Sequence, residues 1–222
     1  MGERGPKPKN KVKIKWSPEF AYALGLLATD GNLSPDKRHI NFTSKDRELV
    51  ELFAECLSIN NRIGRKARGG SREKKYFVVQ FGDVRFYRFL VETGITPKKS
   101  KTLGAVRIPH RYFFDFLRGL FDGDGTFYSY FDRRWRSSYM FYIYFYSASR
   151  KHVLWLQSEI TNRLGIVGHL GGTIDRGIFS LRYAKKDTLC LLKKLYYSPH
   201  VSCLNRKRLK IKRALSIIGT TL

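Results

Sequence analysis

Residues 23–31 read ALGLLATDG, and residues 117–125 read LRGLFDGDG. In both stretches apolar residues recur at helical spacing on several sides, so each predicts a short α-helix that is buried over most of its surface. Small residues at positions 21 and 25, and glycine at 119 and 123, would leave one stripe of each helix without large side chains. Two helix backbones could approach closely along such stripes. For either stretch alone, ordinary core packing is the alternative interpretation.

Each stretch closes with an aspartate and a glycine, at Asp30-Gly31 and Asp124-Gly125. We expect each glycine to cap its helix in the left-handed conformation. A carboxylate at a helix C-terminus faces the negative end of the macrodipole, which costs roughly 0.3–1 kcal/mol. If the two helices pack side by side with aligned ends, the carboxylates converge, and a divalent cation such as Mg²⁺ would offset their repulsion. The sequence therefore predicts a metal site shared by the two stretches.

The segments that follow the two stretches repeat one order of elements. The first copy predicts a hairpin over 32–44, a helix over 45–57, a hairpin over 62–81 and a helix over 83–93; the second predicts a hairpin over 126–147, a helix over 150–164, strands over 167–171 and 178–183, and helices over 185–197 and 204–218. Ser17 and Pro18 form a helix start ahead of the first stretch. Aligning the two copies places Ser44 opposite Ser149.

This repeat predicts an α+β fold of two pseudo-symmetric αββαββα halves. Each half would be an antiparallel sheet with helices on one face, and the halves would join at the packed pair of helices from the two opening stretches, here called the motif helices. We expect a basic, disordered tail over residues 1–15, an N-terminal half over 16–105 and a C-terminal half over 106–222.

The charge of the chain indicates a polyanionic partner. Lys and Arg number 43 against 18 Asp and Glu, a formal net charge of +25. Such an excess repels itself in a compact fold unless a polyanion neutralises it, so nucleic acid is the expected partner. A basic ribosomal or RNA-binding protein would carry the same charge, so charge alone does not choose between these classes.

Other features of the sequence indicate the cellular compartment in which the protein is expected. Three cysteines without metal or disulfide spacing predict reduced thiols, and no apolar run approaches the roughly 18 residues of a membrane span. A signal peptide is not recognisable either. We expect an intracellular protein of the cytoplasm, nucleoid or an organelle matrix, neither secreted nor membrane-bound. The five histidines form no close-spaced ligand set, so we expect most of them at surface or capping positions.

The two opening stretches and their spacing resemble the paired motifs of the LAGLIDADG homing endonucleases, in the form that carries both copies on one chain. The resemblance extends from about Trp16 to the C-terminus. It implies a monomeric, site-specific endonuclease that hydrolyses phosphodiesters of double-stranded DNA at a long asymmetric target. It also implies that Asp30 and Asp124 hold Mg²⁺, with Thr29 and Gly123 beside them in the metal site, and that Mn²⁺ or Ca²⁺ can occupy the same place. Ala28 departs from the acidic residue that the second copy keeps as Asp122.

The resemblance also implies a lysine in the loop after each repeated unit, where a cation near the scissile phosphate would stabilise charge or orient water. Lys99 and Lys207 match this position, and their neighbours Lys98 and Arg206 remain alternatives. Each has a simpler interpretation as a phosphate-positioning or solvated cation. Ser44 and Ser149 match a family position after the second strand where a polar residue holds water, and complete the predicted catalytic set.

The predicted strands alternate apolar and polar side chains, so each sheet would have an open polar face. Residues 139–147 read YMFYIYFYS, with tyrosines on one face and apolar residues on the other. Such tyrosines can bond phosphates or base edges, or simply pack against neighbours. The DNA major groove is wide enough to admit strands. The residues expected to contact DNA from these faces and from the hairpin tips are Arg65, Lys66, Arg68, Arg72, Lys74, Tyr76, Gln80, Arg134, Arg136, Tyr142, Tyr144, Tyr146, Arg176, Ser180 and Arg182.

Two other functions remain open at this point. The same scaffold could serve as an RNA-splicing maturase, with intron RNA as partner, or as a nucleic-acid-binding protein that does not cleave. The presence of both Asp30 and Asp124 argues against a decayed site. A purely structural ribonucleoprotein component would explain the charge and leave the duplicated carboxylates unexplained.

Overall fold

The computed structural model describes residues 10–67, 72–135, 137–173 and 177–222. The first half contains α1 (Pro18–Asp30), β1 (Gly31–Leu33), β2 (His39–Ser44), α2 (Arg47–Cys56), β3 (Gly64–Lys66), β4 (Tyr76–Gly82) and α3 (Val84–Thr93). The second half contains α4 (Phe113–Asp124), β5 (Thr126–Phe131), β6 (Tyr139–Ser147), α5 (Arg150–Leu164), β7 (His169–Thr173), β8 (Ile178–Tyr183) and α6 (Lys185–Leu195), followed by α7 (Asn205–Ile217). The predicted fold class is confirmed.

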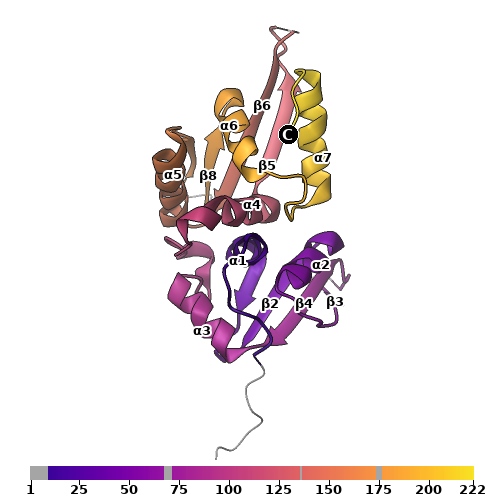
Figure 1. The fold of residues 1–222 in the computed structure, drawn as a ribbon, viewed down its shortest axis with the longest axis vertical. Coiled ribbons are helices and arrows are strands. Elements are labelled where there is room, and N and C mark those ends of the chain that lie inside the picture. Colours follow the sequence, from indigo (N-terminus) through magenta and orange to yellow (C-terminus); the bar gives the residue numbers. More distant parts are fainter. Residues whose placement is uncertain (1–9, 68–71, 136, 174–176) are drawn as a thin grey trace, which may run out of the picture.

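Each half forms a four-stranded antiparallel sheet. The strand orders are β1-β2-β4-β3 and β5-β6-β8-β7, which is the same order in both halves. Short 3₁₀ turns at Lys99–Lys101 and His110–Tyr112 lie in the connection between the halves. Figure 1 shows the two halves stacked along the long axis of the molecule, with α1 and α4 side by side where they meet.

The motif helices α1 and α4 approach each other at their glycines. A Cβ atom on Gly25 would lie 2.2 Å from the carbonyl oxygen of Phe116, and a Cβ atom on Gly119 would lie 2.2 Å from the carbonyl oxygen of Tyr22. Contacts this short with backbone atoms leave no room for any side chain. The stripe of small residues predicted from the sequence is therefore the surface along which the two helices touch.

The glycines that follow the motif helices do not have the predicted left-handed conformation. Gly31 has φ −79° and Gly125 has φ −77°, and both backbones are extended. A Cβ atom on either residue would lie 2.6 to 2.7 Å from backbone atoms of the preceding helical turn, at Leu27 or Phe121. Glycine is needed here because the chain turns tightly from the helix into a strand.

Residues 10–15, predicted as part of a disordered tail, contact the first half of the fold. Residues 1–9 lie outside the described residues, but residues 10–15 do not form the predicted disordered segment. The backbone N–H groups of Lys11 and Val12 donate to Asp83 Oδ2 at 2.8 and 3.0 Å, and Val12 is buried. Asp83 also accepts from the N–H of Phe86, so one carboxylate caps α3 and holds the N-terminal segment.

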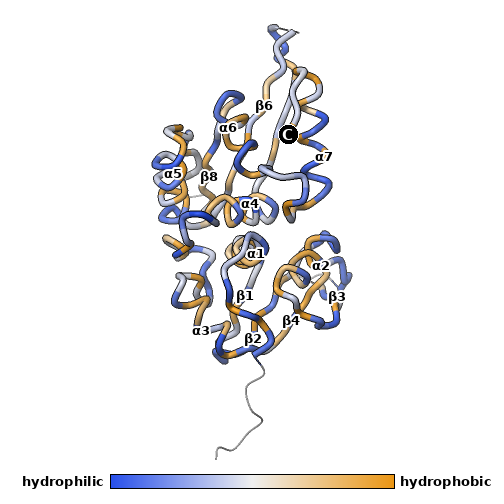
Figure 2. The backbone as a smooth tube through the Cα atoms, viewed as in Figure 1, coloured by the Kyte–Doolittle hydropathy of each residue, from blue (hydrophilic) through white to orange (hydrophobic). Residues whose placement is uncertain are grey.

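The sheets separate apolar and polar faces as predicted, with one exception. Ile40 and Phe42 on β2 are buried, as are Phe141, Ile143 and Phe145 on β6. Thr43 on β2 is the exception, because the alternation along this strand places it on the polar face and yet it is only 5 % exposed. Figure 2 shows apolar residues gathered on α1 and polar residues along α7.

Gly25→Ala is expected to destabilise the protein by about 3 kcal/mol or more, because the added Cβ would force the helix backbones apart and disrupt the packing of both halves. Urea denaturation monitored by circular dichroism would measure this change. Gly104→Ala is the matched control, since a Cβ atom there would meet no atom within 4 Å. Equal stabilities of the two variants would contradict the close approach of α1 and α4.

Candidate nuclease site

The C-terminal ends of the motif helices lie in contact. A Cβ atom on Gly123 would lie 2.1 Å from Thr29 Oγ1, and the Thr29 hydroxyl itself donates to the carbonyl oxygen of Leu26 at 2.9 Å. Asp30 follows Thr29 and Asp124 follows Gly123, and these two aspartates end the motif helices. The predicted convergence of helix ends is therefore present. Asp30 is half-buried, whereas Asp124 is exposed.

Lys99 interacts electrostatically with both of these aspartates. Its side chain is buried, 5 % exposed, and its Nζ donates to the carbonyl oxygen of Gly31. Burial lowers the pKa of Lys99 to about 8, and the opposing attractions that raise it come from Asp30 and Asp124. Because both carboxylates act on one ammonium group, the two motif ends and Lys99 form one electrostatic cluster.

Lys207 occupies the equivalent position in the second half. Its Nζ donates to the carbonyl oxygens of Phe121, Asp122 and Gly125 at 2.5, 2.9 and 2.7 Å. Burial lowers its pKa to about 8, against attraction from Asp122 and, more weakly, Asp124. Gly125 follows α4 as Gly31 follows α1, so the two lysines satisfy matching helix-end carbonyls. Each lysine therefore neutralises the negative end of a helix.

The two alternative cations, Lys98 and Arg206, lie at exposed positions. Lys98 is exposed, with φ 55°. The side chain of Arg206 is 60 % exposed, and its Nη2 lies 2.6 Å from Asp46 Oδ2. Of each pair of alternatives, Lys99 and Lys207 are the residues that contact the ends of the motif helices.

The alignment of Ser44 with Ser149 is wrong by two residues. Ser44 ends β2 and its Oγ accepts from the N–H of Asp46 at 3.2 Å, while Ser147 ends β6 and its Oγ accepts from the N–H of Ser149 at 3.0 Å. Each of these serines stands three residues before the following helix. Ser147 is therefore the equivalent of Ser44, and Ser149 that of Asp46. The equal spacing between each serine and the next helix could have revealed this equivalence from the sequence. The greater length of the second hairpin concealed it.

The loop that carries each lysine is held by a helix of the other half. Ser149 Oγ donates to the carbonyl oxygen of Leu103 at 2.5 Å, and the His152 Nδ1 lies 2.8 Å from the carbonyl oxygen of Gly104. The first half holds the second in the same way. Asp46 pairs with Arg206, and Glu48 Oε1 accepts from the N–H of Asn205 at 3.1 Å. The start of α5 thus fixes the loop after Lys99, and the start of α2 fixes the loop before Lys207.

His152 is buried, 2 % exposed, whereas the other four histidines are exposed or half-buried, in line with the expectation for most of them. Burial lowers its pKa to about 4, so the ring is neutral at pH 7. Its Nε2 has no hydrogen-bond partner among the described residues. Together with Asp124 and Ser147 the ring lines a small cavity of about 20 Å³ beside the helix ends. A buried histidine on α5 could not be found from its spacing, because α5 carries polar residues on several faces.

Asp122 has a structural role that explains why the first copy can carry Ala28. Its Oδ2 accepts from the hydroxyl of Tyr22 at 2.9 Å and from the N–H of Leu204 at 2.7 Å. Burial raises its pKa to about 6. This single carboxylate connects α1, α4 and the start of α7, so the junction needs it only once.

Arg118, in the middle of a motif helix, is also completely buried. Its guanidinium donates to the carbonyl oxygens of Leu195 and Ser202 at 2.8 Å each, and to Asp115 Oδ1 at 2.8 Å. This arginine fastens α4 to the segment after α6. The apolar pattern of the motif helix gave no sign that Arg118 has this function.

The residues present fit a hard divalent cation whose coordination is completed by substrate. Magnesium in proteins is commonly bound through one or two carboxylates, with waters and substrate phosphates in the remaining positions. Asp30 and Asp124 at touching helix ends supply such carboxylates. Within the described ranges no cluster of three or more His, Cys, Asp and Glu side chains that could hold a metal ion is present.

The open face of the second sheet carries a ladder of tyrosines. Tyr144 and Tyr146 stack with ring centroids 5.7 Å apart, Tyr130 and Tyr142 stack at 6.2 Å, and Arg182 lies 5.4 Å from the ring centre of Tyr142. Ser180 pairs with Tyr146 on this same face. Tyr128 and Tyr130 are not among the residues predicted to contact DNA, although alternation along β5 and its pairing with β6 place both on this face.

The open face of the first sheet contains Gln80, and Tyr76 beside Lys66, its partner in the strand pairing. Arg65 lies on the opposite face, over the ring of Phe77 at 4.8 Å, because it is one residue out of phase with Lys66. Arg72, Lys74 and Arg134 are exposed near the hairpin ends. Arg68, Arg136 and Arg176 lie outside the described residues.

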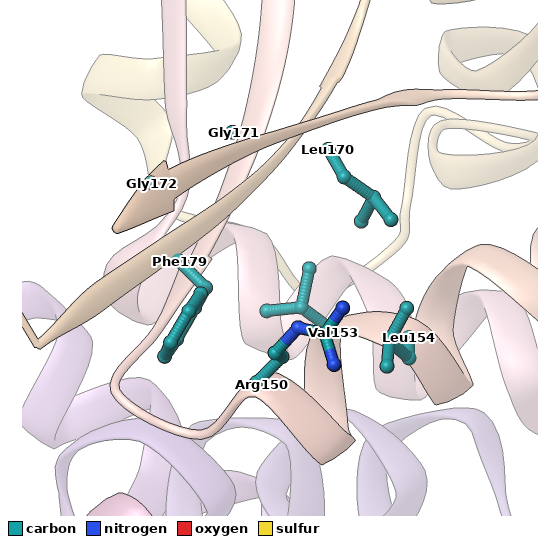
Figure 3. A pocket seen from close by; sticks show the side chains of 7 residues that line it. All are labelled: Arg150, Val153, Leu154, Leu170, Gly171, Gly172 and Phe179. Atoms are coloured by element: carbon teal, nitrogen blue, oxygen red, sulfur yellow. The ribbon is translucent and has the colours of Figure 1, made fainter. Parts of the chain in front are cut away.

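A larger cavity, of about 270 Å³, lies away from the motif aspartates. Figure 3 shows its lining, which comes from the start of α5 and from β7 and β8. The lining residues include Arg150, Val153, Leu170 and Phe179 but no carboxylate. It does not offer the acidic groups that a metal-dependent hydrolytic site requires, so the cluster at the helix ends is the stronger candidate.

Comparisons with known proteins agree with the geometry. The family model described as a LAGLIDADG-like domain matches residues 17–94 and 113–196, so the chain belongs to this family. The two matched segments contain the two halves of the fold, and each includes one motif helix. No curated protein sequence matches the chain. In the described part of the chain no helix has the length and apolar character needed to cross a membrane.

Several solved structures share the fold. The N-terminal LAGLIDADG domain of DUF199/WhiA aligns at 17 % identity and TM-score 0.54, covering 92 % of each chain. The homing endonuclease I-LtrWI bound to target DNA aligns at 11 % identity and TM-score 0.55, over 91 % of this chain and 96 % of the other. I-DmoI in complex with DNA and Mn aligns at 14 % identity and TM-score 0.53, over 82 % and 97 %. At these identities the likeness establishes the fold alone.

His152→Gln is expected to reduce the loss of stability at acid pH. The histidine pKa is about 4 in the folded protein and near 6.5 when unfolded, so the unfolded state binds an extra proton between these values and stability falls as pH decreases through them. The glutamine side chain does not titrate in this pH range. Denaturant titrations at pH 7 and pH 4.5 would measure this difference, which is of order 2 kcal/mol.

The surface variant His200→Gln is the control for this experiment, because His200 is exposed. A decline in stability between pH 7 and pH 4.5 that is the same for the wild-type protein and both variants would contradict a buried, neutral His152.

Proposed function

We propose that this protein is a site-specific endonuclease that cleaves both strands of a long, asymmetric DNA target as a monomer. The observation that carries the proposal is the pair of aspartates at touching helix ends, both acting on the buried Lys99. The fold is shared with homing endonucleases solved with target DNA. The net charge of +25 suits a polyanionic substrate.

In the proposed reaction Asp30 and Asp124 hold Mg²⁺, for which Mn²⁺ or Ca²⁺ can substitute in binding. When bound, the metal supplies Lewis-acid stabilisation of the phosphate and activation of water. The ammonium groups of Lys99 and Lys207 lie at the same helix ends, where they stabilise charge that develops on the phosphate. With pKa values of about 8, both lysines are predominantly protonated at pH 7.

The polar residues after the second strands can orient water next to the phosphate. Ser44 and Ser147 occupy equivalent positions, and Ser147 lines the small cavity next to Asp124. The Oγ of Ser149 is engaged by Leu103, which makes Ser149 a residue that positions the Lys99 loop. Ser147 therefore replaces Ser149 in the proposed set.

Asp30→Asn and Asp124→Asn are each expected to lower the rate of double-strand cleavage by at least about 100-fold, because each removes a negative ligand from the metal. The assay follows conversion of a supercoiled plasmid that carries the selected target into nicked and linear products. Addition of EDTA to the wild-type protein should abolish cleavage. Glu92→Gln, at an exposed position of α3, is the matched control. Full cutting of both strands by either aspartate variant would disprove this site.

Lys99→Met is expected to slow cleavage at saturating DNA by about 100-fold with little change in DNA affinity, since the lost cation acts on the reacting phosphate. Lys98→Met is a close control, because it removes the same charge one residue away at an exposed position. Single-turnover rates and binding constants would be measured for both variants, together with their melting temperatures. Equal rates for the two variants would remove Lys99 from the proposed reaction.

A maturase or a binding protein without cleavage remains the competing proposal, and the substrate preference separates them. The nuclease should bind its selected duplex more tightly than a folded intron RNA at the same salt concentration. Binding to DNA and binding to RNA would both weaken steeply with added salt, so the two affinities are compared over a series of salt concentrations.

A further inference from the structure

The open faces of the two sheets present different side chains at equivalent positions. Strand pairing places Asn32, Asn41 and Gln80 directly opposite one another across β1, β2 and β4, forming a row of three carboxamides. In the second sheet, pairing across β5, β6 and β8 aligns Thr126, Tyr144 and Arg182, and His169 on β7 completes that row.

The two rows lie at the same distance along the chain from the proposed metal site. Asn32 follows Asp30 by two residues, and Thr126 follows Asp124 by two residues. Each row then continues through the strands in the same order, because the two sheets share one topology. The pseudo-twofold relation between the halves therefore places Gln80 and Arg182 at matching positions on either side of the site.

The functional groups in these rows are available to a ligand. Asn32 and Gln80 are exposed and Asn41 is half-buried. Among the residues that the structure describes, the three carboxamide side chains make no hydrogen bonds with one another or with the backbone. Arg182 has no acidic partner within the same described ranges, and the ring of Tyr142 supports its guanidinium at 5.4 Å. A stacked guanidinium is held in place while its hydrogen-bonding edge stays free.

The middle strands of each sheet are the ones that can reach base edges. Neighbouring strands are spaced about 4.8 Å apart. A four-stranded sheet is therefore wider than the DNA major groove, which is roughly 12 Å across, and cannot enter it with all four strands. The strand orders place β2 and β4, and β6 and β8, in the centre of their sheets. Gln80 and Asn41, and Arg182 and Tyr144, are the row members on these central strands.

The chemistry of these side chains discriminates between bases. A carboxamide forms paired hydrogen bonds with N6 and N7 of adenine, and a guanidinium does so with O6 and N7 of guanine. Resting on the proposed function, we propose that Gln80, supported by Asn41, selects adenine in the half-site under the N-terminal sheet, and that Arg182 selects guanine at the symmetry-related position under the C-terminal sheet.

Two consequences for the target follow. The adenine and the guanine lie the same number of base pairs from the centre of cleavage, and they lie on opposite strands, because a twofold relation between protein halves places equivalent contacts on opposite strands. The target is thus asymmetric at these positions, although the two halves share one fold.

The test selects bound duplexes from a randomised pool with the full-length protein and then exchanges the two side chains. Gln80→Arg should convert the preferred adenine into guanine, and Arg182→Gln should convert the preferred guanine into adenine, each with a change in relative affinity of about 5- to 150-fold at that position only. Arg85→Gln, at an exposed position of α3 on the helix side of the first sheet, makes the same chemical change and should leave both preferences intact.

The outcomes separate this inference from the proposed function. If the exchanges change affinity equally for all sequences while cleavage continues, the side chains contact phosphates, and the inference is overturned with the nuclease assignment unaffected. Preferences at positions unequally spaced from the centre would overturn it as well. If the wild-type protein selects no duplex at all, the proposed function fails and this inference fails with it.

Discussion

The contact between the backbones of α1 and α4 is the constraint on which the rest of the structure depends. Gly25 and Gly119 face carbonyl oxygens across this contact at distances that exclude any side chain. The same packing brings Thr29 against Gly123, so the two helix ends cannot be placed independently. The positions of Asp30 and Asp124 relative to each other are thus a consequence of helix packing rather than of the loops that follow.

The tight junction requires buried polar groups, and the molecule satisfies them through elements distant in sequence. Asp122 accepts hydrogen bonds from α1 and from the chain just before α7, and Arg118 donates to the segment after α6. The lysines do the same for the carbonyl groups at the helix ends. Because burial disfavours the charged form of each group, its partners are needed to keep the charge within the fold. Structural and proposed catalytic functions therefore depend on the same network of residues.

The two halves share a fold but differ in how their polar surfaces are built. From the opposite half, the loop after Lys99 receives buried, neutral contacts made by Ser149 and His152, whereas the segment before Lys207 receives an exposed ion pair between Asp46 and Arg206. Exposed pairs of this kind are screened by salt, and buried neutral ones are not. The open faces differ as well, with carboxamides on one sheet and tyrosines with Arg182 on the other. Duplication has preserved the topology and left the surfaces free to diverge.

The sequence alone determined the duplication, the order of elements, the motif helices and the alternation of faces, because these follow from local periodicity and from glycine and aspartate at fixed spacing. It could not determine the extended conformation of Gly31 and Gly125, the burial of His152 and Arg118, the docking of Val12, or the equivalence of Ser44 with Ser147. Each of these depends on atoms supplied by another part of the chain: a neighbouring helical turn, the opposite half, or a paired strand. Spacing along one segment contains no information about such partners, so only the tertiary structure decided them.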